Sequence, residues 1–258
     1  MDVARVVARV REVRPLVHCI TAAVSMNTVA DALLAAGAAP MMTETAQEAP
    51  VIVRRAEALL INLGTLSADG AAGIPPTVAA ARQAGIAWVL DPAAVGLPPV
   101  RTALAGALLE QGPAVVRGNA SEVLVLAGLG SGGRGPDSSD CPELAAEAAR
   151  RVARLTGGVV AVSGAVDLIT DCARTVRCAN GTPLLTRVTG TGCALGALVA
   201  ACCAVTDRWS AAVAATTWLG VAGEVAAGRA RGPGSFRVEL LDALASVGGA
   251  HFAGSGIL

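Results

Sequence analysis

The stretch Val188–Val199 holds the residues of this chain that are best suited to binding an anion. Gly190 and Gly192 alternate with threonines, Cys193 follows them, and the strand-like segment Leu184–Val188 precedes them. This order predicts a strand, a tight turn and a helix N-terminus, where unpaired N–H groups lie at the positive end of the helix dipole. Such a turn binds anions, phosphate above all. A turn that only joins a strand to a helix is the other interpretation.

Cys193 is the one thiol of the chain that this pattern places in a candidate site. At a helix N-terminus we expect the dipole to lower the pKa of the thiol. Three roles are open: a nucleophile, although no histidine pairs with it in the sequence; a weak base or positioning group for a substrate hydroxyl; and inert packing.

Apolar segments that alternate with helical ones predict a mostly parallel central sheet with helices on both faces, an α/β fold. The expected strands are Leu16–Thr21, Ala58–Ile61, Ile86–Leu90, Ala114–Val116 and Val159–Val162, with an antiparallel pair at Asp167–Thr170 and Thr175–Ala179. The expected helices are Arg5–Arg14, Thr28–Ala36 with Asn27 as its N-cap, Pro76–Ala84, Val100–Leu109, Ser121–Leu126, Glu143–Leu155, Ala194–Val205, Ala211–Gly228 and Val238–Val247. We expect residues 1–258 to form a single domain.

Polar side chains stand at the carboxyl ends of successive expected strands. They are Asn62, Asp91, Arg117, Asn119 and Ser163. In open α/β sheets this edge forms the ligand crevice, so we expect these residues to share one site with the glycine turn. Arg117 can neutralise phosphate oxygens, and Ser163 can donate to one or can cap a turn.

Two carboxylates near this edge could hold Mg²⁺ beside a polyphosphate. Asp91 and Glu122 offer hard oxygen ligands, either directly or through water. The alternative for Asp91 is a turn residue before Pro92. The alternative for Glu122 is a carboxylate that stabilises the start of a helix.

Composition excludes several classes of site. The formal net charge is zero without a basic patch, which argues against nucleic acid as a partner. No lysine is present, which excludes a Walker A lysine and Schiff-base chemistry. His18 and His251 are the only histidines, too few for a multi-histidine metal site. We expect His18 to be a satisfied, partly buried residue and not a catalyst.

The cysteines indicate a reducing compartment. There are seven, an odd number, without a C-x-x-C motif, and the charged N-terminal segment is unlike a signal peptide. The uncharged run Cys193–Thr206 is short and rich in alanine and glycine, so it predicts a buried helix and no membrane span. We therefore expect a cytoplasmic protein without a membrane partner.

Taken together, these motifs resemble the hydroxyethylthiazole kinases, thiamine-salvage enzymes of the ribokinase-like fold. The similarity extends over nearly the whole chain, and RGNASE followed by GTGCAL is its most specific part. The segments that carry it are PLVHCIT (15–21), LLAAGAAPMM (33–42), LLINLGTL (59–66), WVLDPAAVG (88–96), VVRGNASEV (115–123), GGRGPD (132–137), VTGTGCAL (188–195) and GPGSF (232–236).

The resemblance implies transfer of the ATP γ-phosphoryl group to the hydroxyl of 4-methyl-5-(2-hydroxyethyl)thiazole with Mg²⁺. It implies a homotrimer whose thiazole sites are shared between subunits, with Met42 meeting the Gly190 loop of another chain. It implies ATP contacts for Arg117 and Ser163, thiazole contacts for Gly190 and Met42, a place beside the reacting hydroxyl for Cys193, and places near the metal and phosphates for Asp91 and Glu122. We add Gly190, Thr191 and Gly192 to Cys193 as predicted catalytic residues, Asn119 to the ATP-binding residues, and Asn62 and Gly64 to the substrate-binding residues.

One departure concerns the acceptor. The family usually has Asn after HCIT, where this chain has Ala22, so an amide of the thiazole pocket is missing. The alternatives are a kinase for another heteroaromatic alcohol, such as a hydroxymethylpyrimidine or pyridoxal-like compound, a nucleotide-responsive binding protein, or a thiol-dependent acyl-transfer enzyme. The loop Gly128–Asp140 is either a lid near the nucleotide or a connection.

Overall fold

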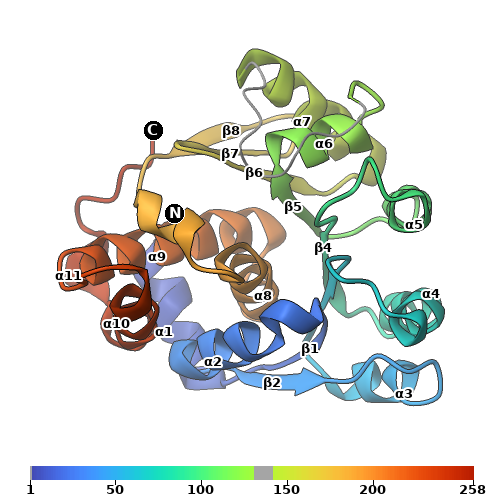
Figure 1. Cartoon of the computed structure of the whole chain (residues 1–258), viewed down its shortest axis with the longest axis horizontal. Helices are drawn as coiled ribbons and strands as arrows, with labels where there is room; N and C mark the ends of the chain where they lie inside the picture. Colours follow the sequence, from blue (N-terminus) through green and yellow to red (C-terminus); the bar gives the residue numbers. More distant parts are fainter. Residues whose placement is uncertain (1, 131–141) are drawn as a thin grey trace.

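One eight-stranded sheet runs through the molecule (Figure 1). The structure is a computed structural model that describes residues 2–130 and 142–258. The strand order is β2-β1-β3-β4-β5-β6-β7-β8; the pairs from β2 to β6 are parallel, and β7 and β8 add as antiparallel neighbours. The strands are β1 (Leu16–Ile20), β2 (Ala39–Met42), β3 (Ala58–Asn62), β4 (Ala87–Asp91), β5 (Val115–Asn119), β6 (Val159–Ser163), β7 (Asp167–Thr170) and β8 (Thr175–Cys178).

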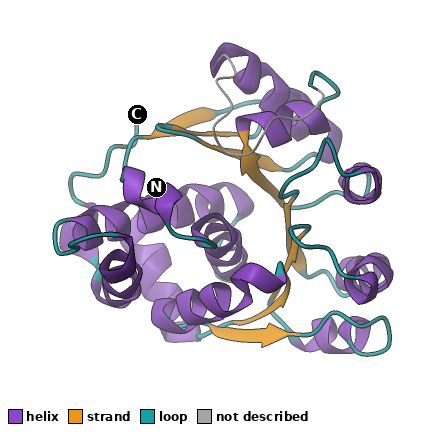
Figure 2. Cartoon of the chain, viewed as in Figure 1, coloured by secondary structure: helices purple, strands orange, loops and turns teal. Residues whose placement is uncertain are grey.

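Helices cover both faces of this sheet, which confirms the expected fold class (Figure 2). One layer contains α1 (Val3–Val13), α2 (Met26–Ala36), α8 (Thr191–Cys203), α9 (Arg208–Ala227), α10 (Pro233–Ser246) and α11 (Gly249–Phe252). The other contains α3 (Ala49–Ile52), α4 (Ala68–Gln83), α5 (Pro99–Leu109), α6 (Ala120–Leu126) and α7 (Pro142–Thr156). Three 3-10 helices complete the described part: η1 (Ala23–Ser25), η2 (Val53–Arg55) and η3 (Pro183–Arg187).

Alternation along the strands divides the apolar core into two layers. On β3, Leu59 and Ile61 belong to the core under α3–α7, whereas Ala58 and Leu60 belong to the core under α1, α2 and α8–α10. Both faces of the strand are therefore buried, as is usual for parallel sheets. Because side chains alternate with a period of two, Asn62 lies on the α8 side of the sheet.

The two central helices of the α8 layer are built mainly of small apolar residues. At Gly196 of α8, an added Cβ would lie 3.1 Å from Leu60 Cδ1, so the absence of a side chain lets α8 lie close against the sheet. Helix α9 is long and apolar enough by composition to cross a membrane, but 78% of its apolar window is buried inside the fold, and it is the one such helix among the described residues. Its apolarity is explained by its place in the core.

Two expectations from the sequence are wrong. Residues 184–188 do not form a strand: Pro183 occupies the first turn of η3, and the Thr182 side chain accepts a hydrogen bond from the Leu184 N–H. The helix expected at Pro76–Ala84 begins at Ala68 instead, because the Ser67 hydroxyl accepts from the Gly70 N–H and caps the helix there.

Smaller differences concern the start of α2 and elements that the sequence did not indicate. Helix α2 begins at Met26, so Asn27 lies inside it and is not its N-cap. Strand β2 and helices α3 and α11 were not expected. The antiparallel pair β7–β8 is confirmed. Most of the expected loop at 128–140, with the motif at 132–137, lies outside the described residues.

Candidate active site

The sheet register places Asn62, Asp91 and Arg117 in one row on the α8 face, and Ser163 extends this row on the same face, two residues farther along β6. Asn62 pairs with Asp91 across β3 and β4, and Leu90 pairs with Val116, so Asp91 and Arg117 are the next pair along. Asn62 Nδ2 donates to Asp91 Oδ2 at 2.8 Å, and Arg117 Nη2 donates to Ser163 Oγ at 2.9 Å. Arg117 Nη1 lies 3.4 Å from Asp91 Oδ2. The expected convergence of these residues is therefore present.

Asp91 and Arg117 form a buried ion pair at the centre of the row. Burial raises the pKa of Asp91 to about 7, against the attraction of Arg117. Burial by itself would lower the pKa of Arg117, but the carboxylates of Asp91 and Glu122 outweigh it and the pKa is raised. Asp91 Oδ1 and Arg117 Nε are buried and have no partner within the described chain. The guanidinium is thus a fixed, charged donor.

The glycine turn begins α8 directly over this guanidinium. Gly190 is the helix N-cap with φ +91°, a left-handed conformation that favours glycine. A Cβ on Gly192 would lie 2.8 Å from Arg117 Nη1, so the turn approaches the cation as closely as a bare backbone allows. Thr191 Oγ1 donates to the Leu185 carbonyl at 2.7 Å, which commits this hydroxyl to holding η3. The Gly192 backbone and the Arg117 guanidinium are therefore immediate neighbours.

Cys193 follows in the first turn of α8 and is half-buried. Burial and the nearby Asp91 raise the pKa of the thiol, and its polar neighbours Ser25, Arg117 and Asn62 only partly oppose this. The expectation of a lowered pKa is wrong, because the loss of hydration outweighs the helix N-terminus. A protonated thiol can hydrogen-bond and position a hydroxyl, but it is a poor nucleophile.

Glu122 and Asn119 join the loops around the row. The Asn119 side chain accepts from the Glu122 N–H at 2.9 Å, and Glu122 Oε2 accepts from the Asn119 N–H at 2.8 Å, a complete capping box for α6. Glu122 Oε1 accepts from the Ala94 N–H at 2.9 Å in the loop after β4. The expected place of Glu122 in a first helical turn is confirmed.

At the other end of the row the site is lined by small and neutral groups. Gly64 donates its N–H to Asn62 Oδ1 at 2.9 Å, and a Cβ on Gly64 would lie 2.9 Å from the Ala22 Cβ. Asn62 therefore uses its amide to orient Gly64 and Asp91. Met42 lies farther away, at the end of edge strand β2 beside Cys19, and a single chain does not show it at the site.

Comparison with known proteins identifies the family of this chain. The profile of the hydroxyethylthiazole kinase family matches residues 7–249. The chain belongs to this family. A hydroxyethylthiazole kinase from Granulibacter bethesdensis is 55% identical over 235 residues, 91% of this chain and 86% of the relative, and one from Clavibacter sepedonicus is 52% identical over 245 residues, 95% and 89%. The resemblance inferred from the motifs is thus confirmed.

Solved structures agree with this membership. A hydroxyethylthiazole kinase from Pyrococcus horikoshii OT3 superposes with a TM-score of 0.92 at 37% identity, covering 99% of this chain and 98% of that one. A pyridoxal kinase from Staphylococcus aureus shares the fold alone, with a TM-score of 0.66 at 16% identity, covering 81% and 88%. The fold of this hydroxyethylthiazole kinase family member is therefore ribokinase-like.

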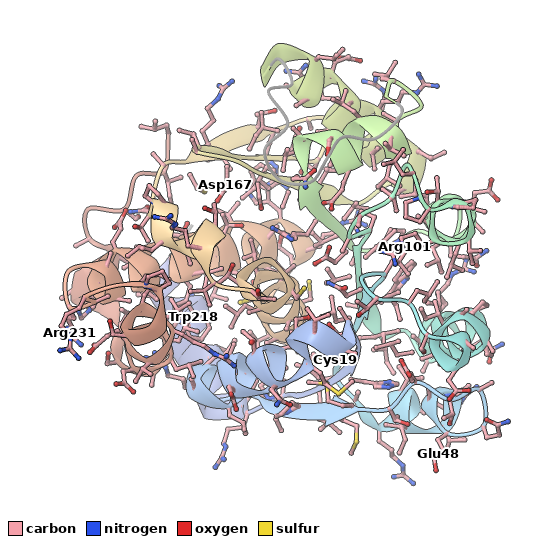
Figure 3. All side chains as sticks on the ribbon, viewed as in Figure 1. Cys19, Glu48, Arg101, Asp167, Trp218 and Arg231 are labelled. Atoms are coloured by element: carbon pink, nitrogen blue, oxygen red, sulfur yellow. The ribbon has the colours of Figure 1, made fainter. Side chains whose placement is uncertain are left out.

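Three polar residues of the site were missed by the sequence reasoning. Asp167 begins β7 on the side of the sheet that faces η3 and α8 (Figure 3). Burial raises its pKa to about 6, and its carboxylate accepts from the Gly164 N–H at 2.8 Å. Thr21 and Ser25 are buried beside the neutral end, and Thr21 Oγ1 has no partner in the described chain. No motif included Asp167 or Ser25, and Thr21 lies in PLVHCIT but received no role from it.

His18 pairs with Leu59, three residues before Asn62, and faces the opposite layer. It is fully buried, with Nε2 2.7 Å from the Thr43 carbonyl and Nδ1 unpartnered within the described residues. Burial lowers its pKa, so the imidazole is neutral. His18 is more buried than expected, and one of its two ring nitrogens lacks a hydrogen-bond partner. Within the described chain its side chain makes no hydrogen bond to a residue of the row.

Proposed function

We propose that this protein transfers the γ-phosphoryl group of ATP to the hydroxyl of 4-methyl-5-(2-hydroxyethyl)thiazole, a step of thiamine biosynthesis and salvage. Membership of the hydroxyethylthiazole kinase family supports the reaction. The observation that carries the assignment of the site is the contact of Gly192 with Arg117, which brings a helix N-terminus and a buried cation to one point. Both features bind phosphate.

Phosphoryl transfer requires alignment and charge neutralisation and little covalent chemistry from the protein. We assign the backbone N–H groups of Gly190, Thr191 and Gly192 to the migrating phosphoryl group. Arg117, Ser163 and Asn119 bind ATP on the β5–β6 side. Cys193 positions the acceptor hydroxyl, which a protonated thiol can do when the transition state is loose and the proton leaves late.

The residues that the sequence assigned to a metal fit Mg²⁺. Asp91 has a buried Oδ1 without a protein partner, a site for a hard cation or its water. Both oxygens of Glu122 accept backbone N–H bonds, so Glu122 would hold the ion through its remaining lone pairs or through water. The ion, when bound, neutralises charge on the β- and γ-phosphates. We expect EDTA to remove activity and Mg²⁺ to restore it.

We propose a homotrimer in which the acceptor pocket is completed by a neighbour. Met42 would then meet the Gly190 loop of another chain, with Asn62 and Gly64 forming the near wall. The partly exposed Met41 beside it on edge strand β2, and the exposed Leu34 on α2, support a contact there. Light scattering after size exclusion measures the oligomer, and a monomer that phosphorylates the alcohol at full rate would contradict a shared site.

We also propose that residues 1–258 act as a single catalytic domain in the cytoplasm. One sheet contains all of the described strands, which supports the first point. The cysteines of the described residues are free thiols, which supports a reducing compartment.

The test is ATP-to-ADP conversion, measured with and without the thiazole alcohol. Release that depends on the thiazole supports the proposal. Release only with a hydroxymethylpyrimidine or a pyridoxal-like alcohol would assign another acceptor. ATP binding without release would indicate a binding protein, and inactivation of an ATP-independent activity by thiol reagents would indicate acyl transfer.

A further inference from the structure

The loop after β4 contains a turn that its own sequence disfavours. The Val95 N–H donates to the Pro92 carbonyl at 3.1 Å, which closes a β-turn over Ala93 and Ala94. Ala94 has φ +61°, whereas φ of Ala93 is not positive, so the turn has the φ pattern of type II. The third position of such a turn favours glycine, because a side chain is strained there. Contacts from outside the turn must therefore hold it in this form.

Two side chains hold the middle peptide of this turn, one at each pole. The peptide carries the Ala93 carbonyl on one side and the Ala94 N–H on the other. Arg101 Nη1 donates to the carbonyl at 3.3 Å, and the N–H donates to Glu122 Oε1 at 2.9 Å. Arg101, labelled in Figure 3, lies in the first turn of α5, and Glu122 lies in the first turn of α6. A single peptide unit thus links the arginine to the carboxylate.

Reversing this peptide would lose both contacts at once. A type I turn differs from type II by a reversal of the middle peptide, and its third position suits alanine. The reversed peptide would direct the Ala93 carbonyl towards the Glu122 carboxylate and the Ala94 N–H towards the guanidinium. Each pair would then bring two acceptors or two donors together. The bond from Arg101 therefore favours the form of the turn in which Glu122 receives an N–H.

We propose that Arg101 is a positioning residue for Glu122: by holding the Ala93 carbonyl it keeps the Ala94 N–H on Glu122 Oε1, and so orients the carboxylate for Mg²⁺. The inference rests on the proposed function, because it concerns the metal of that reaction. The other oxygen, Oε2, accepts from the Asn119 N–H of its own helix cap at 2.8 Å. The two bonds together fix the plane of the carboxylate, and the one from the turn depends on Arg101.

Binding of Mn²⁺, a probe for a carboxylate site that takes Mg²⁺, measures this role without turnover. The EPR signal of the free ion is recorded for the protein with the non-hydrolysable ATP analogue AMP-PCP, and for the analogue alone as the reference. We expect Arg101→Gln to weaken Mn²⁺ binding by about tenfold, as for the loss of an outer contact to a metal ligand. Coulomb's law alone predicts the opposite sign, since removal of a nearby cation favours a metal ion.

Replacing Ala94 by glycine should make the arginine unnecessary. Glycine adopts a positive φ without strain, so the turn keeps its form without a contact from Arg101. In an Ala94→Gly background, Arg101→Gln should change Mn²⁺ binding by less than about twofold. Arg11→Gln is the matched control, because Arg11 Nη2 also donates to backbone carbonyls, those of Leu244 and Val247, but lies in α1. We expect this control to leave Mn²⁺ binding unchanged.

Several results would overturn the proposal. Tighter Mn²⁺ binding in Arg101→Gln would mean that the arginine acts only through its charge, and unchanged binding would mean that it has no role at the metal. Weaker binding of AMP-PCP in EDTA, measured by calorimetry, would mean that Arg101 binds phosphate directly. An equal loss in the Ala94→Gly background would mean that it does not act through the turn.

The test also separates this proposal from the proposed function. Failure of the unaltered protein to bind Mn²⁺ would refute the metal site and the role of Arg101 with it. Absence of thiazole-dependent ADP release by an unaltered protein that does bind Mn²⁺ would instead refute the proposed function.

Discussion

The two ends of the polar row differ in charge. At the β4–β6 end, Arg117 contacts Asp91, and Glu122 and Asp167 act on the pKa of the guanidinium. At the β1–β3 end the side chains are neutral: Thr21, Ser25, Asn62 and the protonated thiol of Cys193. Both ends lie under the same helix, so the difference lies in the side chains and not in the scaffold.

This difference separates two tasks of one reaction. Phosphate needs a fixed cation and aligned N–H groups, and a buried ion pair that is disturbed costs several kcal/mol. An uncharged alcohol needs shape and single neutral hydrogen bonds, each contributing about 1 kcal/mol. We therefore expect changes at the charged end to abolish activity and changes at the neutral end to adjust the choice of acceptor.

The largest effect is expected at the contact between the turn and the cation. Gly192→Val would place a branched side chain against Arg117 and should reduce kcat by at least about 10²-fold, as for loss of a charge-stabilising site. Gly106→Ala is the control, since nothing lies within 4 Å of the added Cβ in α5. Steady-state ADP release measures kcat of both variants. A normal kcat in Gly192→Val would contradict the expectation that changes at the charged end abolish activity.

Next in size is the ion pair itself. Arg117→Met should reduce kcat/KM for ATP by about 10²-fold and destabilise the fold by about 3 kcal/mol, because Asp91 is left buried without its partner. Adding Asp91→Asn should restore much of the stability, measured by guanidinium denaturation, but not the activity. If the single variant were as stable as the unaltered protein, the charged end would not depend on pairing.

Behind the neutral end, on the opposite face of the sheet, a buried charge at His18 should reduce stability. Burial lowers the pKa of His18 in the fold, so the unfolded chain binds its proton more readily. Stability is then fully present above the ordinary histidine pKa of about 6.5 and declines as pH falls below it. Denaturation at a series of pH values should show a smaller decline for His18→Gln than for the control His251→Gln. Equal declines would contradict a neutral buried imidazole.

The smallest effect is expected at the thiol. Cys193→Ser keeps a hydrogen-bonding group and should reduce turnover by about two- to tenfold, with ATP affinity unchanged. Complete loss of turnover in Cys193→Ala, with ATP still bound, would mean that the thiol takes part in the chemical step. Cys193 would then be as necessary for activity as Arg117.

The sequence predicted the polar row well because its residues come at the ends of buried apolar runs. Asn62, Asp91, Arg117 and Ser163 each end a buried apolar run, and the parallel sheet brings such ends together. Glu122 was placed correctly because a capping box has a local spacing. The fold class followed from the same alternation of segments.

The features that were missed depend on contacts and burial that no local sequence pattern shows. Ser25 looks like a helix cap, but its hydroxyl donates to the Ala22 carbonyl and its Cβ lies against the glycine turn, which only the packing of α2 determines. The pKa of Cys193 was misjudged because the sequence shows a helix start but not the burial around it. The start of α4 was missed because Pro75 and Pro76 suggested a beginning where the helix was already formed.

The matched register of β3, β4 and β5 has a consequence for protein engineering. Inserting one residue within any of these strands would turn its terminal polar side chain to the opposite face while leaving the apolar composition almost unchanged. Insertions in the connections that precede the strands leave every polar side chain of the row on its original face of the sheet. Libraries that vary length should therefore retain catalysis when they alter the helix-to-strand connections and lose it when they alter the strands.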